Sequence, residues 1–349
     1  MNNINKDINL PAEWVAQDAI LIAWPHAATD WDYILEETVA CYKQIAEHIL
    51  DCEDLIVVTP NVEQAKADMA SIMAHAPHQV HFYCIDTNDT WARDFGPVTV
   101  SVDGHTTAID FKFNAWGMKY AADKDNQIVR QLDAHHIFNQ PVVDCHDFVL
   151  EGGSIESDGN GTLMTTTSCL LACNRNEKMQ LPDIEQYLKA TLGAKHIIWL
   201  KHGMVAGDDT DGHIDTLARF APGNVIVYNG AGDQHDAQAR SLDEMKKELA
   251  AARNSEGQPY RLVELPLPRP IYDEKGCRLP ATYANFLVTN GQVLVPTYNQ
   301  EDIDTKALET LQQAFPGRTA TGIDCTSLIK QHGSLHCVTM QIPHNTLKL

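Results

Sequence analysis

A repeating unit constrains the fold of this chain more than any other feature of its sequence. The unit is an apolar strand, a tight turn that contains glycine, a second strand, an amphipathic helix and a third strand. Its turns lie at 103–104, 158–161, 222–224 and 290–291, and helical patterns follow at about 123–136, 179–192, 234–253 and 302–315. Strands are expected after the turns at 106–113, 162–171, 225–230 and 292–299, and after the helices at 141–145, 196–201, 260–266 and 319–325. These units predict an α/β fold built from ββαβ modules.

A fifth module can be assembled from the two ends of the chain. The strand expected at 19–24 is followed by a helix from about 30 to 50 and a strand at 55–60, but no partner strand precedes it. The apolar run 335–342 near the C-terminus is a strand without a module of its own. If this run pairs with 19–24, five modules close into a ring with pseudo-fivefold symmetry, and closure protects the sheet edges as it does in propellers. The alternative is an irregular α/β protein in which the spacing arises by chance.

The length and charge of the chain limit its partners. We expect residues 1–349 to form a single catalytic domain with a short N-terminal tail at 1–10, because no Pro/Ser-rich linker or low-complexity tract divides them. The formal net charge is −21. A polyanion repels nucleic acid and anionic lipid, so partners of either kind are not expected. A cationic substrate is the natural complement, although many proteins are acidic only for solubility.

Cysteine usage and hydropathy indicate the compartment. The nine cysteines are odd in number and scattered without a C-x-x-C pair, which is typical of reduced thiols in a cytoplasmic protein. The N-terminus has no apolar segment of the kind found in secretory signals. The segment 279–300 carries no formal charge and is long enough to span a bilayer, but Pro280, Asn290, Gly291 and Pro296 predict a strand, a turn and a strand instead.

The segments that link successive modules hold an unusual set of polar residues. In a five-membered ring these segments converge on one axis, which brings together three carboxylates, an imidazole, an amide and a thiol. The residues are Asp94, Glu151, His213, Asp215, Asn285 and Cys337. Each also has an ordinary interpretation: an isolated cysteine is usually an inert core residue, and Asp94 can pair with the preceding Arg93. Trp91 and Trp116 can likewise be core residues instead of walls of a binding site.

The acidic run from 208 to 215 also suggests a metal. It faintly resembles a calcium loop, but it lacks the fixed ligand positions and the terminal glutamate. His213 and Asp215 with Asp94 and Glu151 could hold a hydrolytic Mn²⁺ or Zn²⁺. Sites of that kind usually use more than one histidine, and the other histidines lie elsewhere in the sequence. We therefore predict no metal.

A thiol among carboxylates favours chemistry on a cation. Neighbouring negative charge raises the pKa of a thiol, so Cys337 needs a positively charged ligand to become a thiolate. A planar guanidinium matches paired carboxylates such as Asp94 and Asp215, and its central carbon would face the sulfur. Cys337 would add to that carbon, and His213, oriented by Glu151, would protonate the departing nitrogen. Water activated by His213 would release a urea-type product without any metal or organic cofactor.

Five ordered motifs carry a resemblance that covers nearly the whole chain, from about residue 11 to residue 343. They read WARDFGP, EGGSIESDGNGTLMTT, DDTDGHIDTLARF, NFLVTNGQVLVP and GSLHCVTMQIP. The chain resembles the agmatine deiminase and bacterial peptidylarginine deiminase family of the guanidine-modifying superfamily. The resemblance implies a five-bladed α/β-propeller, association into homo-oligomers, and roles for five residues: Cys337 as nucleophile, His213 as acid and base, Asp94 and Asp215 as the guanidinium clamp, and Glu151 as their partner. Asn285 has no assigned role.

The substrate expected from the resemblance is agmatine, which would give N-carbamoylputrescine and ammonia in a step toward putrescine. Asp208 and Asp209 are placed to meet the ammonium of agmatine, with Trp91 and Trp116 beside them as further substrate-binding residues. The sequence departs from the family pattern at 332–336, just before the nucleophile, where many agmatine deiminases carry a run of glycines. Three alternatives stay open: a deiminase of peptidyl-arginine or another guanidine, a metal-dependent hydrolase, and a catalytically silent propeller that binds polyamines.

Overall fold

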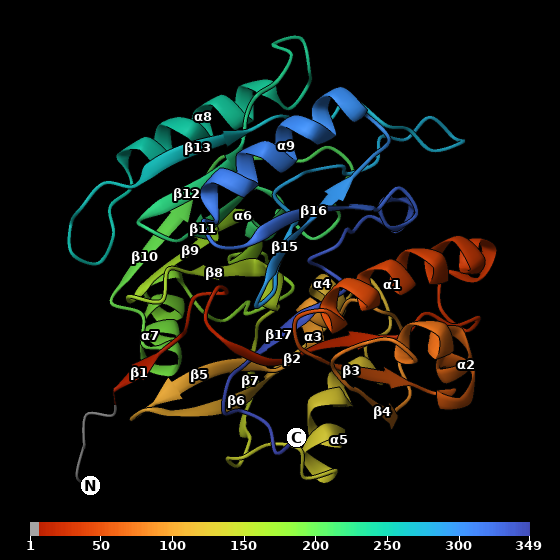
Figure 1. The fold of residues 1–349 in the computed structure, drawn as a ribbon. Coiled ribbons are helices and arrows are strands. Elements are labelled where there is room, and N and C mark those ends of the chain that lie inside the picture. Colours follow the sequence, from red (N-terminus) through yellow and green to blue (C-terminus); the bar gives the residue numbers. More distant parts are fainter. Residues whose placement is uncertain (1–6) are drawn as a thin grey trace, which may run out of the picture.

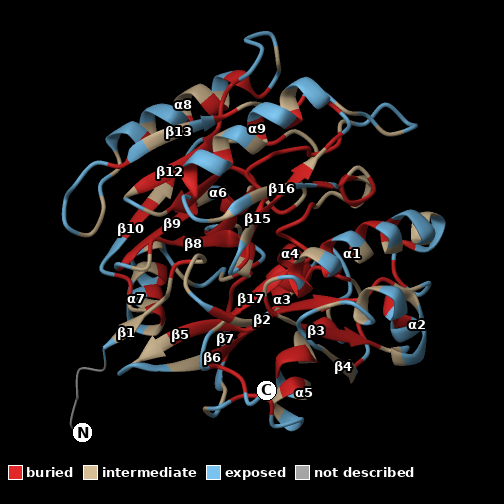
Figure 2. Cartoon of the chain, viewed as in Figure 1, coloured by how far each residue is buried: buried red, intermediate tan, exposed pale blue. Residues whose placement is uncertain are grey.

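The computed structural model describes residues 7–349 as a mixed α/β fold (Figure 1). The described strands form five separate open sheets of three or four strands each. The longer helices lie at the periphery, with the strands inside them. Buried residues follow the strands and the inward faces of the helices, as Figure 2 shows. The hydrophobic core therefore lies between the sheets and their helices.

Four of the sheets contain the predicted module. In each, two strands form an antiparallel hairpin, and a third strand pairs parallel to the second after a helical crossover. The strands are β5 (Val98–Val102), β6 (His105–Lys112) and β7 (Val143–Val149); β8 (Ile155–Ser157), β9 (Thr162–Thr166) and β10 (His196–Leu200); β11 (Ala218–Ala221), β12 (Val225–Asn229) and β13 (Arg261–Leu265); and β14 (Leu287–Val288), β15 (Gln292–Thr297) and β16 (Thr319–Asp324). The four predicted turns lie in the hairpins of these modules.

The pairing predicted between the chain ends is confirmed. The fifth sheet has the order β17-β2-β3-β4, from β17 (Met340–Pro343), β2 (Gln17–Ala23), β3 (Asp54–Thr59) and β4 (Val80–Cys84). Strand β17 runs antiparallel to β2, with Met340 opposite Leu21 and Ile342 opposite Ala19. A strand from the end of the sequence therefore completes the sheet begun at its start.

The crossover helices lie where the helical periodicity predicts them. They are α1 (Leu35–Leu50), α5 (Ile128–Ala134), α7 (Leu181–Leu192), α8 (Ala239–Ala251) and α9 (Glu301–Ala314). Helix α7 shows the local signals clearly, because it begins with a capping box formed by Gln180 and Asp183 and ends at Gly193 in the left-handed conformation. Helix α2 (Val62–Met73) and strand β4 extend the fifth sheet beyond the predicted module.

Some predicted boundaries are wrong. The strand expected at 335–342 begins only at Met340, and residues 335–338 form a turn instead. The run 162–171 leaves the strand after Thr166, whose side chain accepts a hydrogen bond from the Cys169 N–H and so caps α6 (Thr167–Leu170). Within the predicted tail, β1 (Ile8–Asn9) pairs with β5, while residues 1–6 lie outside the described part.

The uncharged stretch 279–300 forms the hairpin of β14 and β15, as predicted. No helix in residues 7–349 combines the length and apolar character needed to cross a membrane.

Candidate active site

The links between modules meet near the centre of the molecule. Short helical turns follow the links: α3 (Ala92–Phe95), η3 (Gly152–Ser154) and η4 (Ile214–Thr216). Turn η3 contacts both α3 and η4. The turn at 335–338 comes next to them, since the backbone N–H of Arg93 donates to the carbonyl of Cys337 at 3.1 Å. The tertiary structure thus brings together segments that are far apart in sequence.

These turns carry the residues singled out from the sequence. Asp94 lies on α3, Glu151 immediately before η3, His213 immediately before η4, and Asp215 on η4. Cys337 lies in the turn before β17. All five are at most 6% exposed. Asp94 and Cys337 also line a small cavity whose walls include Trp91 and Trp116.

Gly153 lies at the centre of this group. A methyl group added to its Cα would lie 2.7 Å from Nδ1 of His213, 2.9 Å from Oδ1 of Asp94 and 3.0 Å from Oδ2 of Asp215. Its own backbone N–H donates to Asp94 at 3.0 Å. Three functional side chains therefore converge on one backbone atom, and only glycine leaves room for them.

The distances between the functional groups are short. His213 Nδ1 is 3.6 Å from Asp94 Oδ1, and His213 Nε2 is 4.0 Å from Glu151 Oε2. Cys337 Sγ is 3.8 Å from Asp215 Oδ2. Asn285 accepts hydrogen bonds at its Oδ1 from the backbone N–H groups of His336 and Cys337, at 3.0 and 3.3 Å. This amide therefore holds the turn that presents the sulfur.

Burial and charge shift the pKa values of this group in different directions. Burial raises the pKa of Cys337 well above its ordinary value, and Asp215 and Asp94 raise it further, as the carboxylates in the sequence predict. Burial also raises the pKa of Asp94, to about 6. Burial would lower the pKa of His213, but Asp94, Cys169 and Glu151 together raise it well above its usual range.

Asp215 is kept ionised by a buried neighbour that sequence reasoning did not find. Burial tends to raise the pKa of Asp215, but the hydrogen bond and the charge of His336 bring it below the ordinary value. His336 Nδ1 lies 2.8 Å from Asp215 Oδ2, and Nε2 lies 2.8 Å from Glu13 Oε1. Glu13 is in turn paired with Arg93 and Arg219. Only the neighbouring position of His336 and Cys337 could have indicated this network from the sequence.

Arg175 is a second functional neighbour that the sequence does not reveal. Its Nε donates to both carboxylate oxygens of Glu151 at 2.9 and 3.0 Å, and its Nη1 donates to Asp211 at 2.7 Å. The Arg175 side chain is fully buried. Its two hydrogen bonds fix the orientation of Glu151.

The cavity itself is acidic and aromatic. Its lining includes four carboxyl groups, three aromatic side chains and Cys337, and no lysine or arginine is among the described lining residues. The acids and aromatic residues are Asp30, Asp89, Asp94, Asp209, Trp91, Trp116 and Tyr120. Trp116 Nε1 donates to Asp94 at 2.8 Å, and Trp91 Nε1 donates to Asp89 at 2.9 Å. Trp116 adopts a left-handed φ of 54°, a strained conformation that functional sites often retain.

Two predicted binding residues, Asp208 and Asp215, are not among the described residues that line the cavity, whereas Asp209 is. Asp215 lies behind the lining at 3.8 Å from the Cys337 sulfur. The carboxylate of Asp208 accepts hydrogen bonds from the backbone N–H groups of Thr210 and Gly212 and from the Thr210 hydroxyl. Asp208 is absent from the described lining and serves to fold its own loop.

Three buried polar atoms of the site have no hydrogen-bond partner among the described residues. They are both ring nitrogens of His213 and Oδ1 of Asp215. A buried polar atom without a partner is costly, so a ligand is expected to satisfy such atoms. A planar cation with several N–H groups would supply donors to Asp215, and His213 would be free to exchange protons.

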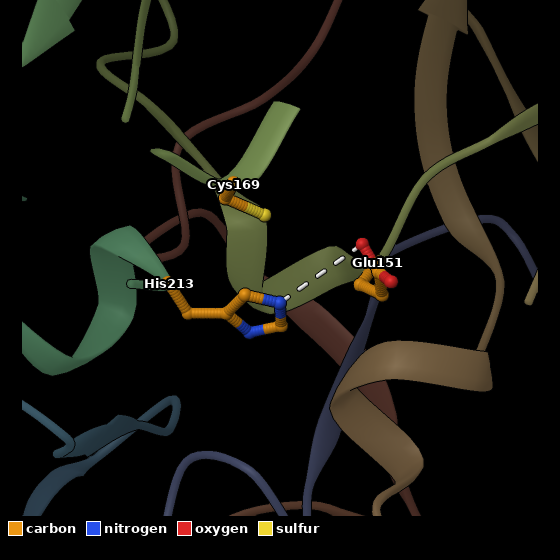
Figure 3. Close-up of side chains that lie close together, drawn as sticks. All are labelled: Glu151, Cys169 and His213. Carbon is orange, nitrogen blue, oxygen red and sulfur yellow. Dashed lines mark ion pairs between the residues drawn. The ribbon is translucent and has the colours of Figure 1, made fainter. Parts of the chain in front are cut away.

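One group in the described structure has the composition of a metal site. Ligand atoms of Glu151, Cys169 and His213 all lie within 4.8 Å of one another, and Figure 3 shows the three side chains. The acidic run considered from the sequence contributes only His213 to this group, and Cys169 was not predicted.

Comparisons with known proteins identify the family of this chain. The model of the family described as Porphyromonas-type peptidyl-arginine deiminase matches residues 9–343. A relative from Shewanella sp. (strain W3-18-1), provisionally named an agmatine deiminase, is 33% identical, and the match covers 98% of this chain and 99% of the relative. Among solved structures, a provisionally named arginine deiminase from Porphyromonas gingivalis is 46% identical with a TM-score of 0.92, covering 98% of this chain and 100% of the other. A substrate-bound variant of the C. jejuni agmatine deiminase is 35% identical with a TM-score of 0.88, covering 98% of each chain.

Proposed function

The chain belongs to the Porphyromonas-type peptidyl-arginine deiminase family, and from this premise we propose that it is an agmatine deiminase, a hydrolase that acts on a C–N bond of a linear amidine. The reaction converts agmatine and water to N-carbamoylputrescine and ammonia. The observation that carries the choice of substrate is the cavity lining, which holds four carboxylates and, among the described residues, no lysine or arginine. Arginine carries an α-carboxylate that this lining would repel, whereas agmatine is cationic at both ends.

Binding begins with the two cationic ends of the substrate. The guanidinium lies between Asp94 and Asp215, and Oδ1 of Asp215 gains the donor that it lacks. Trp91 and Trp116 enclose the methylene chain, while Asp209 at the mouth meets the ammonium. Asp30 adds to the negative potential of this cavity, and Asp89, whose pKa burial raises to about 7, adds to it in part near neutral pH. Asp208, which folds its own loop, is not part of this proposal.

The positive charge of the substrate lowers the pKa of Cys337, and the thiol proton leaves to solvent. The thiolate adds to the guanidinium carbon and forms a neutral tetrahedral adduct. His213, protonated through its contacts with Asp94 and Glu151, donates its proton to one amino group, and ammonia leaves. A planar S-alkylthiouronium on Cys337 remains.

Hydrolysis of the intermediate restores the enzyme. His213 takes a proton from water, and the resulting hydroxide adds to the thiouronium carbon. The C–S bond then breaks, the thiolate of Cys337 leaves, and the hydroxyl proton passes to solvent, where ammonia takes it up. Once the product departs, the thiolate regains a proton from solvent and the resting thiol is restored. Glu151, held by Arg175, keeps His213 oriented in both half-reactions. In this mechanism protein residues perform every step.

We further propose that the five sheets are the blades of a five-bladed α/β-propeller that forms one catalytic domain. The repeated ββαβ order and the pairing of β17 with β2 support this arrangement. We also place the protein in the cytoplasm, where its product would feed putrescine synthesis. The nine cysteines support that location, because all are free thiols.

The covalent step can be tested by trapping. Wild-type protein mixed with agmatine and quenched in acid should show a mass increase equal to agmatine minus ammonia, located on the peptide that contains Cys337. Cys337→Ala should fold normally, show no adduct and lose turnover by about three orders of magnitude or more. Normal turnover by this variant would reject the mechanism.

The closest alternative is the same chemistry on an arginine, because the P. gingivalis neighbour carries an arginine deiminase name. Values of kcat/KM for agmatine, free arginine and a peptide with C-terminal arginine separate the two. Agmatine should be preferred by at least about tenfold, the effect expected from an uncompensated carboxylate in an acidic cavity. A better arginine or peptide substrate would contradict the choice of agmatine.

A further inference from the structure

Glu151, Cys169 and His213 form a compact buried group of residue types that bind metal ions. The side chains come from three segments: the link before η3, helix α6, and the link before η4. Each is 0 or 1% exposed. In Figure 3 a dashed line joins a ring nitrogen of His213 to the Glu151 carboxylate. The Cys169 sulfur lies on the same side of the ring. The three ligand atoms are within 4.8 Å of one another.

The chemistry of this set suits Zn²⁺. A thiolate, an imidazole and a carboxylate are the three ligand types that zinc uses, and tetrahedral bonds of about 2.0 to 2.3 Å require ligand atoms roughly 3.3 to 3.6 Å apart. His213 Nε2 and Glu151 Oε2 are 4.0 Å apart, so a contraction of a few tenths of an ångström brings them into range. Both ring nitrogens of His213 lack a hydrogen-bond partner in the described structure, so a lone pair is available once the ring is neutral.

The neighbouring residues supply the support that such sites need. Nδ1 of His213 faces Asp94 at 3.6 Å, which resembles the carboxylate–histidine–zinc arrangement of known sites. Arg175 holds Glu151 through both oxygens, and its charge is balanced by Asp211 at 2.7 Å. A carboxylate oxygen that accepts one hydrogen bond keeps a second lone pair for a metal. Asp94 also lines the cavity, so a single carboxylate contacts both the cavity and the His213 ring.

Charge balance favours a divalent ion at this buried position. A metal ligand set of this kind needs a thiolate at Cys169 and a neutral ring at His213, so any protons on these ligands pass to solvent. The thiolate and the Glu151 carboxylate then carry two negative charges, which a divalent ion balances at a site where uncompensated charge is costly.

We propose that Glu151, Cys169 and His213 form a Zn²⁺ site whose occupation reversibly inhibits the enzyme. The ion takes a nitrogen of the imidazole that transfers protons in the proposed mechanism and the carboxylate that orients this ring, so the departing ammonia loses its acid. The inhibitory consequence rests on the proposed function, whereas the binding site itself does not. Cys169 has no part in the chemical steps, and this distinguishes the site from simple poisoning of the nucleophile.

The first test measures binding without turnover. Chelator-treated Cys337→Ala is titrated with Co²⁺, a spectroscopic substitute for Zn²⁺, and the sulfur-to-cobalt charge-transfer absorption is followed in the near ultraviolet. We expect the band to saturate at one equivalent, to disappear in Cys337→Ala/Cys169→Ser, and to persist in Cys337→Ala/Cys145→Ser, whose replaced cysteine is also buried. If Cys169→Ser fails to fold, judged by circular dichroism, Cys169→Ala replaces it.

The second test measures inhibition in the active enzyme. Cys169→Ser should retain agmatine turnover, and the Zn²⁺ concentration for half inhibition should rise by more than about tenfold, because a first ligand is lost. A chelator should restore wild-type activity. Three results would each overturn the proposal. The cobalt band could be absent in Cys337→Ala, it could persist when Cys169 is replaced, or Cys169→Ser could keep the Zn²⁺ sensitivity of the wild-type enzyme. A normal cobalt band in a protein that does not turn over agmatine would reject the proposed function and leave the metal site standing.

Discussion

At the scale of single residues, the site works by separating the pKa values of two similar carboxyl groups. Asp94 and Asp215 are both buried and both face the cavity residues, yet the pKa of Asp94 is raised to about 6 and that of Asp215 is lowered. Their partners explain the difference. Asp94 accepts hydrogen bonds from the neutral donors Trp116 and Gly153. Besides burial, the charges of Asp215 and Glu151 raise its pKa against the opposing effect of His213. Asp215 is instead hydrogen-bonded to His336 and lies near further positive charge. A buried carboxylate gains most from a partner that can carry positive charge.

The raised pKa of Asp94 predicts an acid limb in the activity profile. In the proposed mechanism Asp94 must be ionised to hold the guanidinium, and burial raises its pKa to about 6. The value of kcat/KM for agmatine should therefore fall below about pH 6 and approach a plateau above it, until other groups titrate. The limb should persist in Asp209→Asn, which changes only the carboxylate at the mouth. A profile that stays flat down to pH 4.5 would contradict this assignment.

His336 is expected to act as a positioning residue for Asp215. In His336→Ala, Asp215 loses its 2.8 Å partner, so its pKa should rise. The measured results should be a loss of kcat/KM of about tenfold to a hundredfold and an acid limb displaced to higher pH. His336→Asn keeps a polar N–H near Nδ1 and should recover part of the activity.

The matched control for this prediction is His344→Ala. His344 also contacts an aspartate, Asp18, at 2.8 Å, but its side chain is 62% exposed, so the change should leave both activity and the acid limb unaltered. A drop in activity of His336→Ala without any movement of the limb would indicate a purely structural role.

At the scale of elements, short turns carry the side chains of the proposed site, and the regular strands hold these turns in position. The functional residues lie on α3, beside η3, beside or on η4, and in the turn at 335–338. Such turns can present buried side chains at one point because each follows a strand held in a sheet. Gly153 in η3 shows how little space is left between these side chains.

Gly153→Ala tests how closely the site side chains pack around residue 153. Its added methyl group would come within 3.0 Å of His213, Asp94 and Asp215, so these side chains must move, although the backbone of Gly153 does not require a positive φ. We expect kcat/KM to fall by at least about a hundredfold while the thermal unfolding midpoint drops by only a few degrees.

Gly104→Ala is the control for this change. Gly104 has a φ of +84° and open space around the position of a methyl group, so the substitution should cost about 1 kcal/mol of stability and leave activity unchanged. Full activity of Gly153→Ala would show that the site tolerates more displacement than its packing indicates.

At the scale of the whole molecule, the acidic charge should guide the substrate. The net charge is −21, and part of it lies in the cavity as Asp30, Asp89, Asp94 and Asp209. The kcat/KM for dicationic agmatine should therefore fall by about threefold or more when salt is raised from about 10 to about 200 mM, because the screening length shortens from roughly 30 to under 10 Å. The value of kcat should change little. A salt-independent kcat/KM would show that long-range attraction plays no part.

Much of the fold could be predicted from the sequence, because its signals are local. Turn residues, strand alternation and helical periodicity each depend on residues close together in the chain, and they placed the four hairpins and the crossover helices. Boundaries failed where tertiary contacts decide the conformation. The turn that carries Cys337 reads as strand by composition, but Asn285 holds its N–H groups in another geometry.

The sequence alone determined which chemical groups meet: ordered modules bring their links together, and those links contain a thiol, an imidazole and three carboxylates. It even predicted the direction in which the pKa of Cys337 is shifted, from the carboxylates expected beside it, although burial, which the fold decides, is the larger cause. The tertiary structure decided how each group is held. Glu13 lies 323 residues before His336, and no local sequence pattern predicts their contact. The same holds for the contact of Arg175 with Glu151 and for the proximity of Cys169 to His213. Burial makes these long-range pairs decisive, since a desolvated charge must find its partner wherever the fold places one.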